Sequence, residues 1–267
     1  QNTELMSRIM NYASDLDVLI MQHAEDYELS KNSCINESEV ATRLGLQGVS
    51  DIAEKIIIER DLSLLSKFPC RYHINQISSK NSLNVIKKNK TNGIRFSTGV
   101  SINNLSLNQN DIGEFRTFLK LSSPLREEHD RISLIEGIKN NLIDVIVSDH
   151  VPEDEESKRL PFAQAASGSI GIETLLPLAL ELYHNNSLPL DKIVKCLTIN
   201  PAKILKINKG TLKEGADADI CILDLEKPWI VKAIDLKSKS KNTAIENRKL
   251  QGKVIMTFLN GELVYSN

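Results

Sequence analysis

The stretch LIDVIVSDHVPEDEESKRLPF, residues 142–162, decides the fold of this chain. It opens with an apolar run over residues 142–147 that only Asp144 interrupts, and the run stops at Ser148-Asp149-His150. A short apolar run without period-two alternation is typical of a strand that is buried on both faces in a parallel sheet. Parallel α/β folds collect reactive groups at the carboxyl ends of their strands, where loops leave them open to substrate. The sequence therefore predicts a site at Asp149.

The same design occurs upstream of this stretch. An apolar run over residues 18–22 ends in His23, and Glu25 and Asp26 follow. Two more strands are predicted at 72–77 and 94–100, and helical periodicity predicts helices at 3–14, 37–44, 52–65, 82–90, around 134–138, 172–183 and 190–206, with Ser50 as the cap of the helix at 52–65. Four strand-then-helix units predict parallel strands joined by right-handed crossovers. Such a sheet is either an open, flavodoxin-like layer or half of an eight-stranded barrel.

From Gly210 onward the pattern changes to short β segments. They are predicted at 220–223, 229–231, 254–259 and 263–265. Asn260-Gly261, between the last two, is a strong hairpin signal, and Trp229 is expected in the core of this unit. The sequence therefore predicts an α/β domain at 1–208 and a β-sandwich portion at 209–267.

Composition indicates an ordinary soluble globular protein. The chain has 267 residues, 41% of them hydrophobic and 25% charged, and its net charge of −2 gives no field that would attract nucleic acid or an acidic membrane. Cys34, Cys70, Cys196 and Cys221 lie far apart, which favours reduced thiols in the cytoplasm. Gln1 leads directly into an amphipathic helical pattern, so we expect the chain to start inside a domain.

His23 and Asp149 are the candidates for chemistry. Imidazole is the commonest nitrogen ligand of zinc, so His23 is either a metal ligand or a hydrogen-bonded histidine at a strand end. Asp149 is placed either to bind a metal and take a proton from water, or to cap the following loop. His150 is expected to support that loop rather than to react.

Three other polar segments have simpler expectations. Arg126 either holds a carboxylate bidentately or, as we expect, pairs on the surface with Glu127, Glu128 or Asp130. Residues 167–171 either present backbone N–H groups to an anion or begin a helix. The run Glu153-Asp154-Glu155-Glu156 is expected to be a solvated acidic loop.

Together these residues resemble the dihydroorotases of the cyclic amidohydrolase group, over essentially the whole chain. The matching segments, in order, are His23-Ala24-Glu25-Asp26, Arg43-Leu44-Gly45-Leu46, residues 73–79, Ser123-Pro124-Leu125-Arg126, Asp130-Arg131, residues 143–152, Pro161-Phe162-Ala163, Gly171-Ile172-Glu173-Thr174 and Ser240-Lys241-Asn242-Thr243. The resemblance implies the fifth to eighth strands of a TIM barrel, followed by part of a β sandwich. It also implies zinc-dependent interconversion of dihydroorotate and N-carbamoyl-L-aspartate in pyrimidine synthesis.

The resemblance also assigns roles to single residues. It implies that His23 binds metal, that Asp149 binds metal and shuttles protons, and that the loop from Gly168 to Gly171 closes over substrate. Gln76, however, stands where the family has a metal-binding histidine, and a neutral amide oxygen is a weak zinc donor.

Further departures concern the substrate side of the site. Asn103 and Asn104 stand where paired histidines are usual, and Ser122 stands where a substrate-binding asparagine is usual. Glu153 replaces a histidine near the substrate carboxylate, which a glutamate would repel. The family's early His-x-His motif is not in this chain, so the chain alone is expected to be inactive.

Two hypotheses follow from the resemblance. The first is a working dihydroorotase whose remaining site residues come from elsewhere, with allantoinase and hydantoinase as weaker variants. The second is a degenerate homologue that serves as a structural partner of aspartate transcarbamoylase. Either form is expected in the cytoplasm, with a homo-oligomer as an open alternative and without nucleic-acid or membrane partners.

Overall fold

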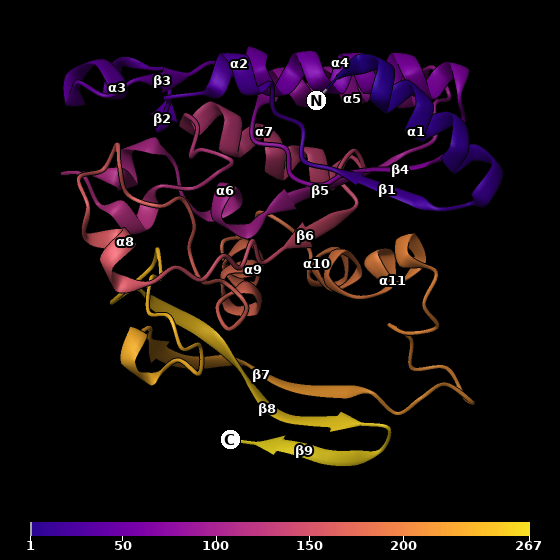
Figure 1. Ribbon diagram of the computed structural model, residues 1–267. Coiled ribbons are helices and arrows are strands. Elements are labelled where there is room, and N and C mark those ends of the chain that lie inside the picture. Colours follow the sequence, from indigo (N-terminus) through magenta and orange to yellow (C-terminus); the bar gives the residue numbers. More distant parts are fainter. Residues whose placement is uncertain (1) are drawn as a thin grey trace.

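The computed structural model describes residues 2–267 and is built around one parallel sheet (Figure 1). Its strands are β1 (Leu19–Gln22), β4 (Arg71–Ile74), β5 (Ser97–Ser101) and β6 (Val145–Val147), and they neighbour one another in chain order. The register pairs Met21 with His73, His73 with Ser97, and Val100 with Ile146. Sequential order is that of a barrel wall, whereas a flavodoxin-like sheet has its first two strands exchanged. The half-barrel alternative is therefore the correct one.

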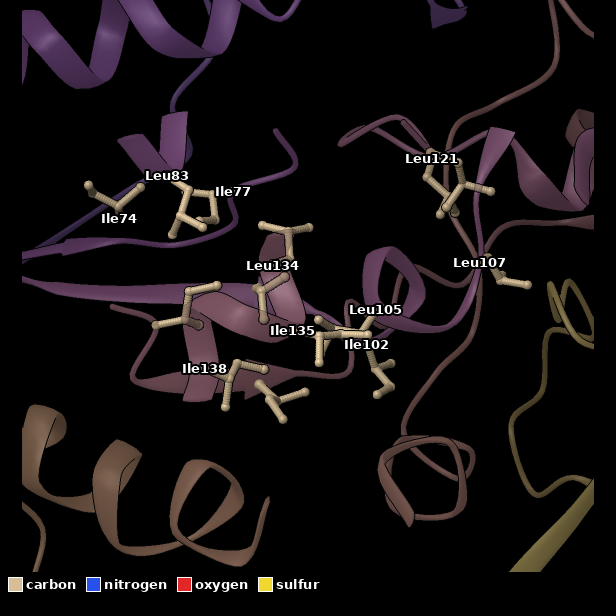
Figure 2. Packing of buried hydrophobic residues seen from close by; sticks show 14 of the residues in the cluster. Ile74, Ile77, Leu83, Ile102, Leu105, Leu107, Leu121, Leu134, Ile135 and Ile138 are labelled. Atoms are coloured by element: carbon tan, nitrogen blue, oxygen red, sulfur yellow. The ribbon is translucent and has the colours of Figure 1, made fainter. Parts of the chain in front are cut away.

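Helices cover one face of this sheet. They are α1 (Thr3–Leu16), α4 (Ile52–Lys67), α5 (Lys80–Thr91) and α7 (Glu128–Lys139), of which α4, α5 and α1 lie along the top of Figure 1. Figure 2 shows part of the core, where Ile74 of β4, Leu83 of α5 and Leu134 of α7 are buried in one apolar cluster. Burial of these side chains supplies the main driving force that holds helices against strands.

Several short elements decorate the loops and were not anticipated from sequence. They include α2 (Tyr27–Ser30) and a two-stranded parallel pair made of β2 (Ile35–Asn36) and β3 (Gly48–Val49), whereas α3 (Glu39–Leu44) confirms the helix predicted at 37–44. The turn-rich segment after β5 contains α6 (Ile102–Ser106) and the 3-10 helices η1 (Gln109–Ile112) and η2 (Thr117–Leu119). The acidic run after β6 forms α8 (Glu155–Arg159).

The chain then leaves the parallel sheet through three helices. These are α9 (Leu175–His184), α10 (Leu190–Leu197) and α11 (Ile199–Leu205). The last part is an antiparallel sheet with strand order β7 (Ile220–Ile230), β8 (Lys249–Leu259) and β9 (Glu262–Ser266), and the short helix η3 (Ala233–Asp235) follows β7. A side chain at Gly252 of β8 would lie 2.4 Å from Leu180 of α9, so this glycine lets the sheet approach the helix closely.

The hairpin prediction at Asn260-Gly261 is confirmed. Both residues have positive φ, 51° and 84°, as a type I′ turn requires. Trp229 packs against the core as expected, and its Nε1 donates to the Gly252 carbonyl over 3.2 Å.

Several predicted bounds are wrong. The strand at 72–77 ends at Ile74, the strand at 94–100 begins at Ser97, and the helix at 172–183 begins at Leu175. Ser50 does not cap α4, because Asp51 occupies the N-cap position without a side-chain hydrogen bond. The two segments at 220–223 and 229–231 are one strand with an irregular register between them. The division of the chain at residue 209 stays a prediction.

β1 and β6 form the two edges of the parallel sheet, and the side chain of Met21 on β1 is 53% exposed. Between residues 2 and 267, every helix is too short or too polar to cross a bilayer.

Candidate functional site at the carboxyl edge of the sheet

The carboxyl edge of the sheet brings together three polar side chains from separate strands. Gln76 follows β4, Ser101 ends β5 and Asp149 follows β6. The Gln76 Nε2 atom donates to Asp149 Oδ1 over 2.8 Å, and the Ser101 Oγ atom donates to Asp149 Oδ2 over 3.3 Å. Both oxygens of the carboxylate therefore accept a hydrogen bond, and Asp149 is fixed at the mouth of the sheet.

Asp149 has an unusual backbone conformation. Its φ is +49°, in the left-handed region that aspartate tolerates better than most other residues do. The turn that this allows sends the chain sharply away from β6 and leaves the carboxylate facing Gln76. The hydrogen bonds to its two oxygens come from the side chains of Gln76, after β4, and of Ser101, at the end of β5.

His23, at the end of β1, lies in the same electrostatic environment. Its Nε2 atom is 3.8 Å from Glu25 Oε2. The Glu25 carboxylate raises the pKa of His23, burial opposes that increase, and the carboxylates of Glu54 and Asp149 contribute further in the same direction as Glu25. The three carboxylates therefore favour the protonated form of His23.

Ser122 and Ser123 approach this edge from the loop before α7. Both line a small crevice together with His23, Glu25 and Arg126. The Ser123 Oγ atom donates to Gln76 Oε1 over 3.3 Å. From sequence, Ser123 was identified only as part of a segment that resembles the family, because its partner lies 47 positions earlier in the chain.

A buried polar network beneath the crevice corrects the prediction for Arg126. This residue is only 5% exposed and forms no surface pair with Glu127, Glu128 or Asp130. Its guanidinium donates to Ser78 Oγ over 3.0 Å, to Asn36 Oδ1 over 2.7 Å and to the Val49 carbonyl over 2.9 Å. Glu128 instead pairs with Arg131 at 2.5 Å.

Glu54 of α4 provides the acidic end of this network. Its buried carboxylate accepts the backbone N–H and the hydroxyl of Ser78, over 2.9 and 2.6 Å, and the backbone N–H of Ser79 over 3.3 Å. The Ser78 hydroxyl thus links a buried carboxylate to the buried guanidinium of Arg126. This link joins the loop that carries Gln76 to the loop that carries Ser122 and Ser123.

The side chains of His150 and Asn242 hold the loop from Gly168 to Gly171 in place by hydrogen bonds. His150 Nδ1 accepts the backbone N–H groups of Gly171 and Ile172, over 3.1 and 3.4 Å, so these contacts of His150 are with the loop at 168–171 rather than with the loop that follows Asp149. Asn242 Nδ2 donates to the carbonyls of Val151 and Gly168, each over 3.1 Å. Because His150 already uses these two N–H groups, they are not available to an anion.

Two buried lysines hold this loop and the segment before it, and both were missed from sequence. Lys158 is 2% exposed, and its Nζ atom donates to the carbonyls of Ala166 and Gly168 over 2.8 and 2.9 Å. Burial lowers the pKa of Lys158 to about 8, although Glu153 acts in the opposite direction. Lys120 is also buried and donates to the Ala163 carbonyl over 2.9 Å, and burial lowers its pKa.

The other positions at which this chain departs from the family are Asn103, Asn104 and Glu153. Within residues 2–267, the hydrogen bonds to the Asp149 carboxylate come from Gln76 and Ser101 instead. Asn103 and Asn104 are buried on α6, and Asn104 Nδ2 donates to the Pro124 carbonyl over 3.0 Å. Glu153 is half-buried, and its backbone N–H donates to Asn242 Oδ1 over 3.3 Å. The rest of the acidic run, Asp154 to Glu156, is exposed as expected.

These residues do not form a complete metal site by themselves. Across residues 2–267, no three histidine, cysteine, aspartate or glutamate side chains converge on a point that a metal ion would occupy. The side chain nearest to Asp149 Oδ1 is the Gln76 amide, which presents a hydrogen-bond donor rather than an electron pair. The predicted metal ligands His23 and Asp149 therefore lack a third partner here.

We expect Gly168→Ala to lower the free energy of unfolding by about 2–4 kcal/mol, because a left-handed φ and overpacking both penalise a side chain there. Gly168 has a φ of +139°, and a Cβ atom would lie 2.5 Å from Val151 Cγ1. Chemical denaturation monitored by circular dichroism measures the loss. Gly215→Ala is the matched control, because Gly215 has a φ of +83° but nothing within 4 Å. Equal losses in both variants would contradict the steric account.

The chain is similar in sequence to known proteins over nearly its whole length. The sequence pattern that defines the amidohydrolase family matches residues 1–264. The chain is 42% identical to a dihydroorotase of Ehrlichia canis over 266 residues and 43% identical to one of Ehrlichia chaffeensis over 265 residues, in each case over 99% of this chain. These alignments include 60% and 59% of the two relatives, so the chain spans about 60% of the length of the curated relatives it matches.

Solved structures show the same partial coverage. The L-hydantoinase (dihydropyrimidinase) of Arthrobacter aurescens superimposes on all of this chain with a TM-score of 0.87 at 25% identity, using 61% of its own length. The dihydropyrimidinase of Brevibacillus agri NCHU1002 does so with a TM-score of 0.89 at 20% identity, using 60% of its length. The predicted fold class, part of a (β/α)8 barrel followed by a β portion, is thereby confirmed.

Proposed function

The chain belongs to the amidohydrolase family, and we propose that it supplies the carboxyl-terminal half of a dihydroorotase site. The reaction would be the reversible opening of dihydroorotate to N-carbamoyl-L-aspartate. The observation that carries this proposal is the Asp149 carboxylate, fixed by Gln76 and Ser101 at the carboxyl edge of the sheet, the same edge at which His23 follows β1. Identities of 42–43% to dihydroorotases over 99% of the chain support the choice of substrate class.

Asp149 is the group that we assign to proton transfer. Ring opening adds water to a ring carbonyl carbon, breaks the C–N bond and leaves the ring nitrogen in need of a proton. A fixed carboxylate can take a proton from the water and return it to that nitrogen, so the proton balance closes on one residue. Zinc is implied by the resemblance, but no step is assigned to it because the described residues lack a complete ligand set.

The test is ring opening of dihydroorotate, followed by ultraviolet absorbance, with the protein as its gene encodes it. We expect turnover that falls by at least about 100-fold in Asp149→Asn, since general acid–base catalysis contributes about 100- to 10,000-fold. Glu156→Gln is the matched control, because Glu156 is an exposed carboxylate on the following helix. Loss of turnover in both variants, or in neither, would refute the role of Asp149.

A second candidate is a non-catalytic homologue that binds aspartate transcarbamoylase in the cytoplasm. The hydrogen bond from Gln76 to Asp149 favours it, because it uses an oxygen that a metal ion would need. Sedimentation of the protein with purified aspartate transcarbamoylase distinguishes the candidates. A stable complex without dihydroorotate turnover supports the partner role, turnover without a complex refutes it, and self-association alone indicates a homo-oligomer.

A further inference from the structure

The orientation of the Gln76 amide is fixed by its neighbours. The side chain is only 8% exposed, its Nε2 atom faces Asp149 Oδ1 at 2.8 Å, and its Oε1 atom accepts from Ser123. If the amide were reversed, Oε1 would face Asp149 Oδ1 at this distance, and two acceptors would repel each other. The Ser123 hydroxyl can donate or accept, so Asp149 alone decides the orientation.

In this orientation the amide oxygen of Gln76, which is the atom that could bind a cation, does not face Asp149. An amide N–H cannot ligate a metal ion, and the amide oxygen is occupied by Ser123. The second Asp149 oxygen accepts from Ser101. Both oxygens of Asp149 thus accept hydrogen bonds from groups at the ends of β4 and β5, an arrangement that requires no ion.

We propose that Gln76 takes the place of a metal ion as the partner of Asp149. At this edge of the site, a hydrogen-bond donor stands where a metal site would have its third ligand. The inference deepens the proposed function and rests on it only for the identity of the site. It makes a prediction about one side chain, because His23 lines the crevice whose Ser123 binds Gln76, and Gln76 binds Asp149. Restoring an imidazole at position 76 should complete a set of two histidines and a carboxylate, which is typical of zinc sites with an open position.

The experiment is a titration with Co²⁺ alone, read by its visible ligand-field absorption, on the protein as its gene encodes it. We expect Asp149→Asn to leave the Co²⁺ binding of the wild-type protein unchanged. We expect Gln76→His to bind Co²⁺ at least about 100-fold more tightly than wild type, since even an indirect partner of a metal ligand changes affinity by about 10- to 100-fold. Asp149→Asn in the Gln76→His background should abolish this gain.

Asn75→His is the matched control, because it adds an imidazole one position away on the same loop. A gain equal to that of Gln76→His would mean adventitious binding and would overturn the proposal. Wild-type binding of Co²⁺ that Asp149→Asn abolishes would also overturn it, and this measurement needs no variant at position 76. Neither result depends on dihydroorotate turnover, so failure of the proposed reaction is distinguishable from failure of this inference.

Discussion

Arg126→Met will lower the free energy of unfolding by about 3–5 kcal/mol, because it removes the buried positive group of a network that also contains the buried Glu54 carboxylate. The guanidinium is buried and makes three hydrogen bonds, to Ser78, Asn36 and the Val49 carbonyl. Methionine fills much of the volume but removes the donor of Asn36 Oδ1 and one of the hydrogen bonds made by Ser78 Oγ and by the Val49 carbonyl. It also leaves the Glu54 carboxylate buried without a positive group, because the Ser78 hydroxyl no longer connects the two. Urea denaturation monitored by circular dichroism measures the loss.

Arg131→Met is the matched control for this prediction. Arg131 makes the same kind of side-chain contacts, but its pair with Glu128 is partly exposed, and such pairs contribute about 0–1 kcal/mol. The double variant Glu54→Gln with Arg126→Met should be less destabilised than the sum of the single variants, because each single variant leaves one charge unpaired. Strict additivity would show that Glu54 and Arg126 do not stabilise each other.

Lys158 will make the protein more stable as pH rises above about 8. Its pKa is about 8 in the folded protein, against an ordinary value of 10.5. Between these values the unfolded chain binds more protons than the folded protein, so stability increases with pH, and below about 8 both states are protonated and the contribution is constant. The full difference corresponds to about 3 kcal/mol by the conversion between pKa and free energy.

The measurement is the free energy of unfolding at a series of pH values from 7 to about 10.5, for wild type and Lys158→Met. We expect the wild-type curve to rise relative to the variant across this window. Lys158→Arg should remove the rise as well, because guanidinium does not titrate there, whereas Lys213→Met should keep it because Lys213 is exposed. Parallel curves for wild type and Lys158→Met would refute the assignment.

Local sequence patterns were sufficient for the framework of this molecule. The apolar runs that end in His23 and in Ser148-Asp149 predicted β1 and β6, and the Asn260-Gly261 pair predicted the last hairpin. Each of these signals lies within a few residues of the element it specifies. β2 and β3, by contrast, have two residues each, which is too short for any periodicity.

The interior of the site could not be predicted in this way. Arg126 contacts Asn36 and Ser78, which lie 90 and 48 positions away, so its burial depends on tertiary packing rather than on its neighbours in sequence. Lysine is almost always exposed, and this expectation concealed the role of Lys158 beneath the Gly168 loop. The family resemblance identified Gln76 as a departure, but only the fold shows that its amide faces Asp149.

Strand β1 has a hydrogen-bonded neighbour on one side only. Within residues 2–267, β4 is the strand that pairs with β1 in this sheet, so the outer edge of β1 faces any extended polypeptide of suitable register, with the thioether of Met21 beside it. A strand from the same gene product would close this edge once and permanently. Two copies of the 267-residue chain would instead meet there in proportion to their concentration, so dilution during purification governs whether single molecules or aggregates are recovered.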